Sequence, residues 1–189
     1  MRFLSLLRKC LVVLTAGTLA LPAGAASDLP VPPPGLMTPL PVRETVKPVM
    51  ECGALSQAAI ERVEGAPATI ASAELETKSN GVEFCHVKGM IAPQIQFELH
   101  LPTKTWQGRY LAGGCGGTCG VLLDKVTPNC DNVHAYGGSF ALSFNNSGHV
   151  GPTALDTIWA AGSPQLQVDF AYRASHVTAE VTKKVIKAF

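Results

Sequence analysis

Two stretches in the middle of the chain alternate apolar and polar residues with the period of a β-strand. They cover residues 82–89 and 95–102, and the second places four apolar side chains on one face: Ile95, Phe97, Leu99 and Leu101. Because Ala92-Pro93 lies between them, we expect an antiparallel pair. His86 and His100 fall opposite the apolar faces and are therefore expected at the surface.

Shorter apolar runs flank this pair. Residues 108–112 predict a strand that leads straight into the glycine-rich stretch 113–120. Residues 139–144 predict another strand, which ends in the loop 145–149. Before the strands, residues 54–63 are compatible with a short helix.

The last segment predicts a helix that begins at Ser163 and continues to Phe189. Ser163 is a suitable N-cap, Pro164 suits the first helical position, and lysines near the end complement the helix dipole. The apolar residues recur every three or four positions and form one stripe: Phe170, Ala174, Val177, Val181, Val185 and Phe189.

This order of elements predicts an α/β fold whose sheet is covered on both faces. In such a fold a helix leads back to a further strand, yet the sequence stops on the apolar stripe of its last helix. We therefore expect residues 50–189 to be the front part of a longer α/β domain. Its incomplete sheet would contain an antiparallel strand pair, a strand with a glycine-rich loop and one more strand, followed by the helix.

The first 49 residues predict two segments that precede the folded body. Residues 1–25 have the pattern of a secretory signal peptide, in which basic residues precede an apolar run and Ala23-Gly24-Ala25 fits a cleavage site. Residues 26–49 are rich in proline and predict an extended linker. We expect a secreted or periplasmic protein, with no membrane association after cleavage, because the apolar run is short for a permanent anchor.

Composition excludes two classes of protein. The chain has 15 Lys and Arg against 14 Asp and Glu and no basic stripe, so nucleic acid is not an expected partner. Hydrophobic residues make up 47% of the sequence, which excludes disorder throughout the chain.

The cysteines of an exported protein are interpreted first as disulfides. An odd number remains after signal removal: Cys52, Cys85, Cys115, Cys119 and Cys130. Cys52 and Cys85 each lie beside an early element and are expected to pair, and two of the other three are expected to form a second bridge. As an alternative, those three and His134 have the short spacing of a structural zinc site.

Five glycines among residues 113–120 would let the backbone approach a ligand closely. A dinucleotide loop would need a third glycine where Cys119 stands, and a phosphate loop would need a Lys-Ser/Thr pair where Val121-Leu122 follows. An oxyanion hole, whose backbone N–H groups face a developing negative charge, suits a glycine-rich loop after a strand. A plain tight turn is the alternative.

Candidate nucleophiles and acids are few. There is no G-x-S-x-G motif, and Ser139 enters a strand rather than leaving one, so it is predicted to be structural. His149 is interpreted as a histidine that holds a loop by hydrogen bonds, with catalysis as the alternative. Asp156 and Asp169 are candidate acids for which a cap or surface role is expected. Packing is expected of both tryptophans, Trp106 and Trp159.

Taken in order, several stretches resemble the tannase/feruloyl esterase family. Each is similar to a run of the family pattern: residues 82–89, 97–102 and 106–111 to "FCRVxG…FEvxLP…WNGRfl", 114–120 to "GxGGxxG", 147–151 to "D-x-GHxG", and 168–178 to "iDfgyRAvHvt" in the helix before the nucleophile. The likeness covers Cys52 to Phe189. The family usually has Asp where Asn146 stands, which puts a structural role of that acid in doubt.

The resemblance implies an exported serine esterase with an α/β-hydrolase core and a large lid domain that often holds calcium. It implies esters of aromatic acids as substrates: galloyl, feruloyl, chlorogenate or terephthalate-monoester types. The family's nucleophilic Ser follows this helix, and its Asp and His follow much later, so the sheet is expected to be truncated before the nucleophile elbow and the chain alone to be inactive.

Carried over residue by residue, the resemblance places an oxyanion backbone donor at Gly116, with Gly117 as its neighbour, and a Cys52–Cys85 bridge. It places no metal or cofactor in this chain, since calcium would belong to the lid. Two other functions are weighed beside it: a non-catalytic exported binding module, and a small exported zinc protein.

Overall fold

The computed structural model describes residues 41–189, except 115, 123–137 and 154. Helices and strands follow one another in this order: the 3₁₀ helix η1 (Cys52–Ser56), strands β1 (Ala68–Thr77), β2 (Glu83–Ile91), β3 (Ile95–Pro102), β4 (Arg109–Ala112) and β5 (Phe140–Asn145), the 3₁₀ helix η3 (Ile158–Ala160), helix α2 (Pro164–Val168), the π-helical turn η4 (Asp169–Arg173) and helix α3 (Ala174–Ala188).

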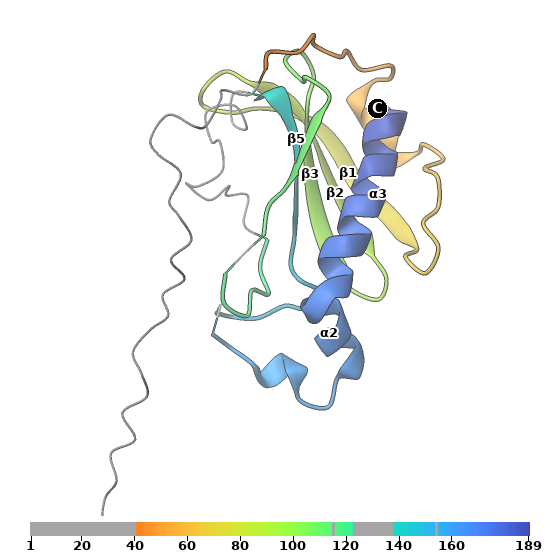
Figure 1. Ribbon diagram of the computed structural model, residues 1–189. Coiled ribbons are helices and arrows are strands. Elements are labelled where there is room, and N and C mark those ends of the chain that lie inside the picture. Colours follow the sequence, from red (N-terminus) through yellow and green to blue (C-terminus); the bar gives the residue numbers. More distant parts are fainter. Residues whose placement is uncertain (1–40, 115, 123–137, 154) are drawn as a thin grey trace, which may run out of the picture. The chain divides into compact units, whose positions relative to one another are not determined.

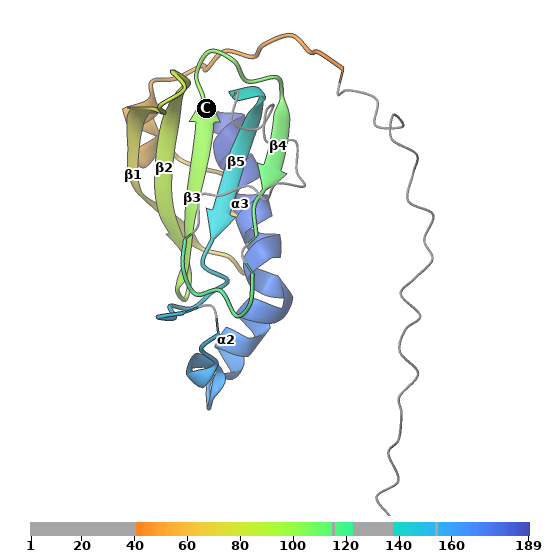
Figure 2. The ribbon, with the colours of Figure 1, turned by 90° about the vertical axis from the view of Figure 1, so that its left-hand side faces the viewer.

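The strands form one mixed sheet in the order β1-β2-β3-β5-β4 (Figure 2). Neighbours are antiparallel except β4 and β5, which run parallel. The predicted antiparallel pair of β2 and β3 is confirmed, and its register places His86 directly opposite His100. The strands predicted at 108–112 and 139–144 correspond to β4 and β5.

Two local features differ from the sequence-based expectation. Strand β1 has no counterpart among the expected elements; it exposes most of its residues and buries only Ala73, so its apolar pattern is weak and pairing with β2 determines its structure. The short helix expected over 54–63 is wrong: only the 3₁₀ turn η1 forms. A short isolated helix is marginal in water, and η1 is tied to β2 by a disulfide between Cys52 and Cys85.

Helix α3 packs across one face of the sheet (Figure 1). Its buried side chains Val177, Val181 and Val185 contact apolar residues of the strands, including Ile91, Ile95, Phe97, Leu99 and Leu101. The predicted apolar face of β3 is thus confirmed. Tyr110 of β4 adds a polar link, because its hydroxyl lies 3.0 Å from Thr182 Oγ1 on α3.

The opposite face of the sheet is only partly the solvated surface that the alternating pattern predicted, since Lys88, Met90 and Gln96 are exposed on it. Phe84, Leu142 and Phe144 are buried there. Among them lie His86 and His100, with exposed fractions of 8% and 3%, so the prediction of surface histidines is wrong. The reason is that aromatic rings of β2 and β5 flank His100, with ring centroids 4.6 and 5.5 Å away.

The C-terminal helix begins where the sequence predicts, after Ser163, although the Ser163 side chain makes no capping hydrogen bond. The π-helical turn η4 interrupts it and adds a residue to one turn. Because this turn shifts the helical phase, Phe170 is 38% exposed, whereas Ala174 and the three valines of the predicted stripe are buried. Among the described residues no helix is both long and apolar enough to cross a bilayer.

The segment before η1 has neither helix nor strand over residues 41–48. Backbone hydrogen bonds attach this segment to the folded body: Val46 N donates to Trp106 O at 2.8 Å, and Val49 N donates to Phe189 O at 2.6 Å. The part of the predicted linker that is described is therefore attached at both points. The predicted signal peptide, residues 1–25, lies outside the described residues.

Candidate functional site

Two loops meet at the carboxyl ends of the parallel strands. β4 leads into the glycine-rich loop, and β5 leads into the loop 146–151, so both begin at the edge of the sheet where α/β proteins bind ligands. Gly151 N donates to Gly120 O at 3.0 Å. Gly120 has φ +89, and a Cβ there would lie 2.5 Å from Gly151 N, so only glycine fits this approach.

Gly116 and Gly117 are exposed on the glycine-rich loop. Cys119 N donates to Gly116 O at 3.2 Å and closes a turn. Within the described part of the chain, neither the Gly116 nor the Gly117 amide donates to a protein acceptor. A Cβ on Gly116 would meet nothing within 4 Å. Among the described residues no acceptor engages these N–H groups, so they are available to a ligand oxygen.

Asn146 fixes the start of the second loop. It is 1% exposed, and its Oδ1 accepts hydrogen bonds from the amides of Gln96 and Gly148, each at 3.0 Å. Both partners are N–H donors, which assigns the accepting atom as the oxygen. An Asn oxygen thus holds the loop at the position where the resemblance implies an Asp.

His149 is buried in this loop and stacks on Trp159, with ring centroids 3.7 Å apart and an interplanar angle of 17°. Phe170 approaches the same ring at 5.8 Å. Within the described residues, neither nitrogen of His149 has a hydrogen-bond partner. The expectation that the His149 side chain holds the loop by hydrogen bonds is therefore wrong. The His149 ring holds the loop by packing against aromatic rings, and Trp159 packs as expected.

The two candidate acids have different environments. Asp156 Oδ1 accepts from Ile158 N at 2.9 Å, which is the local cap expected of it. Asp169, in contrast, is fully buried, so the expected surface role is wrong. Its Oδ1 lies 2.8 Å from Arg173 Nη1 and accepts from Gln165 Nε2 at 2.9 Å.

The Asp169–Arg173 pair joins the helix to the rest of the molecule. Arg173 Nη2 donates to Gly65 O at 2.8 Å and to Ala92 O at 3.0 Å, at the β2–β3 connection. Gly148 packs so closely on the acid that an added Cβ would lie 2.4 Å from Asp169 Cβ. The buried acid and its arginine therefore position the 146–151 loop against η4.

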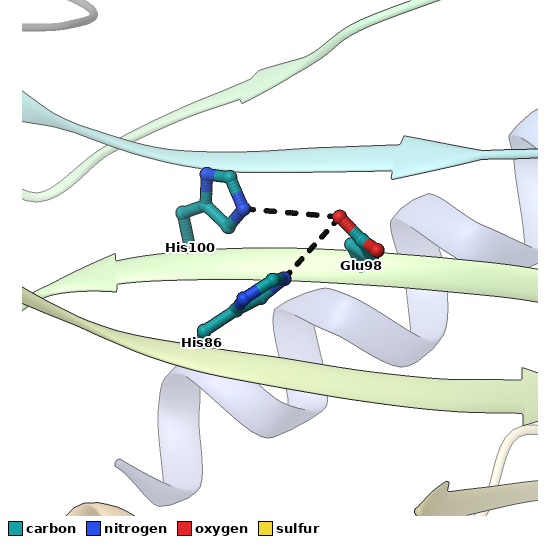
Figure 3. Close-up of side chains that lie close together, drawn as sticks. All are labelled: His86, Glu98 and His100. Atoms are coloured by element: carbon teal, nitrogen blue, oxygen red, sulfur yellow. Dashed lines mark ion pairs between the residues drawn. The ribbon is translucent and has the colours of Figure 1, made fainter. Parts of the chain in front are cut away.

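A second cluster lies on the sheet face opposite α3 (Figure 3). Glu98 Oε2 is 3.2 Å from His86 Nε2 and 4.0 Å from His100 Nε2, and His86 Nδ1 is 2.8 Å from Glu76 Oε1. Burial, with a smaller contribution from the charges of Lys78, His86 and Lys88, lowers the pKa of His100 to about 3.

Sequence reasoning missed this cluster because it assigned the polar face of the strand pair to solvent. The signal was present in the register. A pairing in which Ile91 lies opposite Ile95 places residue 86 opposite residue 100. Glu98 lies two positions from residue 100 on the same face of the sheet.

Cys119 is disulfide-bonded and has a positive φ of 54. A disulfide sulfur is not the thiolate that zinc requires, so Cys119 is not a ligand in this state. The other residues of the predicted bridge and of the alternative zinc site, Cys115, Cys130 and His134, lie outside the described residues.

Comparison with known proteins gives a family. Residues 78–189, more than half of the chain, match the family model described as tannase and feruloyl esterase. The chain belongs to the tannase and feruloyl esterase family. The expectation drawn from the sequence motifs is confirmed.

Curated relatives agree with this assignment. A probable feruloyl esterase B-1 of Aspergillus fumigatus is 32% identical over 112 residues, which cover 57% of this chain and 20% of that protein. A probable feruloyl esterase B-2 of Aspergillus flavus is 32% identical over 92 residues, 49% of this chain and 16% of that protein. The chain thus spans about one fifth or less of these curated relatives.

Two crystal structures share the fold. An esterase from Aspergillus oryzae superposes with a TM-score of 0.58 at 20% identity, covering 73% of this chain and 29% of that one. Feruloyl esterase B from Aspergillus oryzae superposes with a TM-score of 0.51 at 24% identity, covering 74% of this chain and 30% of that one. The mixed five-stranded sheet with its C-terminal helix is therefore a fold that these two structures share over about three quarters of this chain.

The resemblance implies calcium in a lid domain, and the described residues do not provide a fitting site for it. Calcium prefers oxygen ligands, six or more of them. Among the described residues, the one group of three or more metal-ligating side chains consists of two histidines and one carboxylate, which is rich in nitrogen.

Proposed function

We propose that this chain forms the front part of an α/β-hydrolase that cleaves carboxylic esters of aromatic acids by Ser-His-Asp chemistry. The family membership and the feruloyl esterase names of its relatives support the ester class. Because the chain spans about 20% of such a relative, the nucleophilic Ser, the Asp and the His are assigned to sequence outside these 189 residues. The chain by itself would then be inactive.

The contribution of the chain to catalysis is the oxyanion hole. When a serine attacks an ester, the carbonyl oxygen becomes an oxyanion, which preorganised N–H donors stabilise more strongly than the ground state. The observation that carries the proposal is the free Gly116 amide, with Gly117 as its neighbour, beside the carboxyl ends of the parallel strands β4 and β5. The contact of Gly120 with Gly151 holds this loop against the 146–151 loop.

The enzyme is proposed to be secreted or periplasmic and to act on small soluble esters, without nucleic acid or membrane partners. The signal-peptide pattern of residues 1–25 supports export. The cysteines support the same compartment, because Cys52 and Cys85 form a disulfide, and such bonds persist in oxidising environments.

The test uses the full-length enzyme that contains this sequence, assayed with methyl ferulate and methyl gallate. Gly116→Pro removes one N–H donor and should lower kcat by about 10²–10³-fold with a small change in KM. Gly114→Pro is the matched control: a Cβ at Gly114 also meets nothing within 4 Å, and we expect kcat to stay within a few-fold. Thermal melts of both variants check that the fold is retained.

Two results would contradict the proposal. One is an equal loss of kcat in Gly114→Pro and Gly116→Pro. The other is ester hydrolysis, or labelling by a serine-directed phosphonate, with the 189-residue chain alone, because this would place the nucleophile inside it.

A further inference from the structure

Three side chains on the sheet face opposite α3 point toward one another (Figure 3). His86 of β2 and Glu98 and His100 of β3 each offer a ligand atom, and these atoms all lie within 4.8 Å of one another. Metal–nitrogen and metal–oxygen bonds of about 2.0–2.2 Å place neighbouring ligand atoms roughly 3.0–3.5 Å apart. The 3.2 Å between His86 Nε2 and Glu98 Oε2 has that spacing already.

The hydrogen bond of His86 determines what its second nitrogen can do. Glu76 Oε1 can only accept, so Nδ1 of His86 carries the proton across the 2.8 Å contact. A neutral His86 then turns the lone pair of Nε2 toward the carboxylate oxygen of Glu98. Two lone pairs at this separation repel each other unless a proton or a metal cation lies between them.

The Glu76–His86 contact is also the usual partner of a metal-bound histidine. Ligating histidines donate their other N–H to a carboxylate or carbonyl, which fixes the tautomer and the ring orientation. Glu76 reaches His86 from the neighbouring strand β1, where it lies two positions from Glu74, the register partner of His86. The carboxylate of Glu76 therefore orients the His86 ring, and Nε2 of that ring faces the carboxylate of Glu98.

His100 completes the group from the buried side. Its side chain is 4% exposed, and neither ring nitrogen has a hydrogen-bond partner among the described residues. Its Nε2 lies 4.0 Å from the same Glu98 oxygen, and a small rotation of that carboxylate brings it into ligand range. A buried imidazole with no partner is costly, and a ligated ion would satisfy it.

The cluster is open to solvent on one side. A pocket of about 280 Å³ is lined by Glu76, Phe84, His86 and His100, together with Thr77, Lys78 and Ser79. An ion therefore has a path of entry, while Phe84 and Phe144 hold the His100 ring from its flanks.

We propose that His86, Glu98 and His100 bind one divalent transition-metal ion, with zinc as the expected ion and Glu76 as the positioning residue of His86. Two imidazoles and one carboxylate are a zinc-type ligand set and a poor one for calcium or magnesium. Water would fill the remaining position, which is reached from the pocket. This site lies on the sheet, apart from the proposed oxyanion loop, and stands whether or not the esterase proposal holds.

The test is a titration of the chelator-treated full chain with Co²⁺, followed by Zn²⁺ competition. Visible absorption of Co²⁺ reports nitrogen and oxygen ligands, and isothermal titration calorimetry gives the stoichiometry. We expect one ion per chain, displacement of Co²⁺ by Zn²⁺, and no competition from Ca²⁺. Glu76→Gln should weaken affinity by about 10–100-fold, and loss of a ligand in His100→Gln should weaken it further.

Controls separate this site from other histidines and from misfolding. His176 is exposed on α3, so His176→Gln should leave the affinity unchanged. Glu98→Gln keeps the size of the side chain, and its near-UV circular dichroism and melting in chelator serve as the fold check if His100→Gln is unstable.

Three outcomes would overturn the proposal. The first is the absence of Zn²⁺ binding, in which case a proton on His86 bridges the two carboxylates instead. The second is binding that His100→Gln and Glu98→Gln leave unchanged. The third is an affinity that falls in His134→Gln but in none of the cluster variants, which would place the ion at the alternative cysteine–histidine site.

Discussion

Asn146 and Gln96 are joined by a reciprocal pair of hydrogen bonds. Asn146 N donates to Gln96 O at 3.1 Å, and Gln96 N donates to Asn146 Oδ1 at 3.0 Å. Backbone pairing between β3 and β5 ends at Phe97 and Asn145, so this pair continues the ladder by one residue with a side-chain atom in place of a carbonyl. The same oxygen then holds Gly148 N, which starts the loop toward the glycine-rich segment.

Asn146→Ala should therefore destabilise the protein by about 2 kcal/mol, because two amides lose their acceptor and one of them is buried. Urea unfolding measures this loss. Asn145→Ala is the control, since its Oδ1 holds one amide, that of Ser147, at a less buried position. Equal losses in the two variants would show that Asn146 has no special role in the ladder.

The backbone contact between Gly120 and Gly151 predicts a strong effect of one methyl group. Gly120→Ala adds a Cβ 2.5 Å from Gly151 N at a residue with φ +89, and should cost about 3 kcal/mol of folding free energy. Gly116→Ala in the same loop has open space for its Cβ and should change stability by about 0.5 kcal/mol or less. Thermal melts compare the two, and a tolerated Gly120→Ala would contradict the close approach.

The buried pair of Asp169 and Arg173 predicts a large penalty when one charge is removed. Asp169→Asn leaves the guanidinium without its carboxylate and should cost about 3 kcal/mol or more in chemical denaturation. Glu180→Gln removes the acid of an exposed ion pair with Lys183 on the same helix and should change stability by about 0.5 kcal/mol or less. If both substitutions cost the same, the burial of Asp169 has no energetic role.

The disulfide between Cys52 and Cys85 closes a loop with a sequence separation of 33. Loop-closure entropy for that length predicts a loss of about 3–4 kcal/mol in the double variant Cys52→Ala/Cys85→Ala. Urea unfolding without reductant gives the value. Adding reductant to the double variant isolates any contribution of the second bridge, and an unchanged stability of the double variant would show that η1 is held by packing alone.

The strands that carry alternating apolar residues could be predicted from the sequence, because burial of Ile95, Phe97, Leu99 and Leu101 on one face requires that period. Strand β1 could not, since it is an edge strand whose pairing, rather than its composition, makes it a strand. The position of the glycine-rich loop after β4 follows from the sequence too, whereas its contact with Gly151 depends on the parallel arrangement of β4 and β5.

Burial of His86 and His100 on the polar face could not be predicted from the sequence pattern. A histidine that alternates with apolar residues is exposed only if nothing covers its face, and here Phe84 and Phe144 pack against His100. The burial of Asp169 was hidden for a different reason. Its environment is set by Gly148 and by Arg173, and the first of these is 21 positions away in the sequence.

The π-helical turn η4 has a consequence for how this helix is compared between relatives. A single helical wheel drawn through residues 164–188 assigns the wrong direction to the side chains before Arg173. The reason is that the extra residue of the turn rotates α2 relative to α3 about the helix axis. Deleting a single residue within 169–173 would convert the turn to regular α-helix, swing Phe170 toward the sheet and take the carboxylate of Asp169 away from Gly148. The number of residues in η4, more than their identity, determines which side chain of this turn points to the interior.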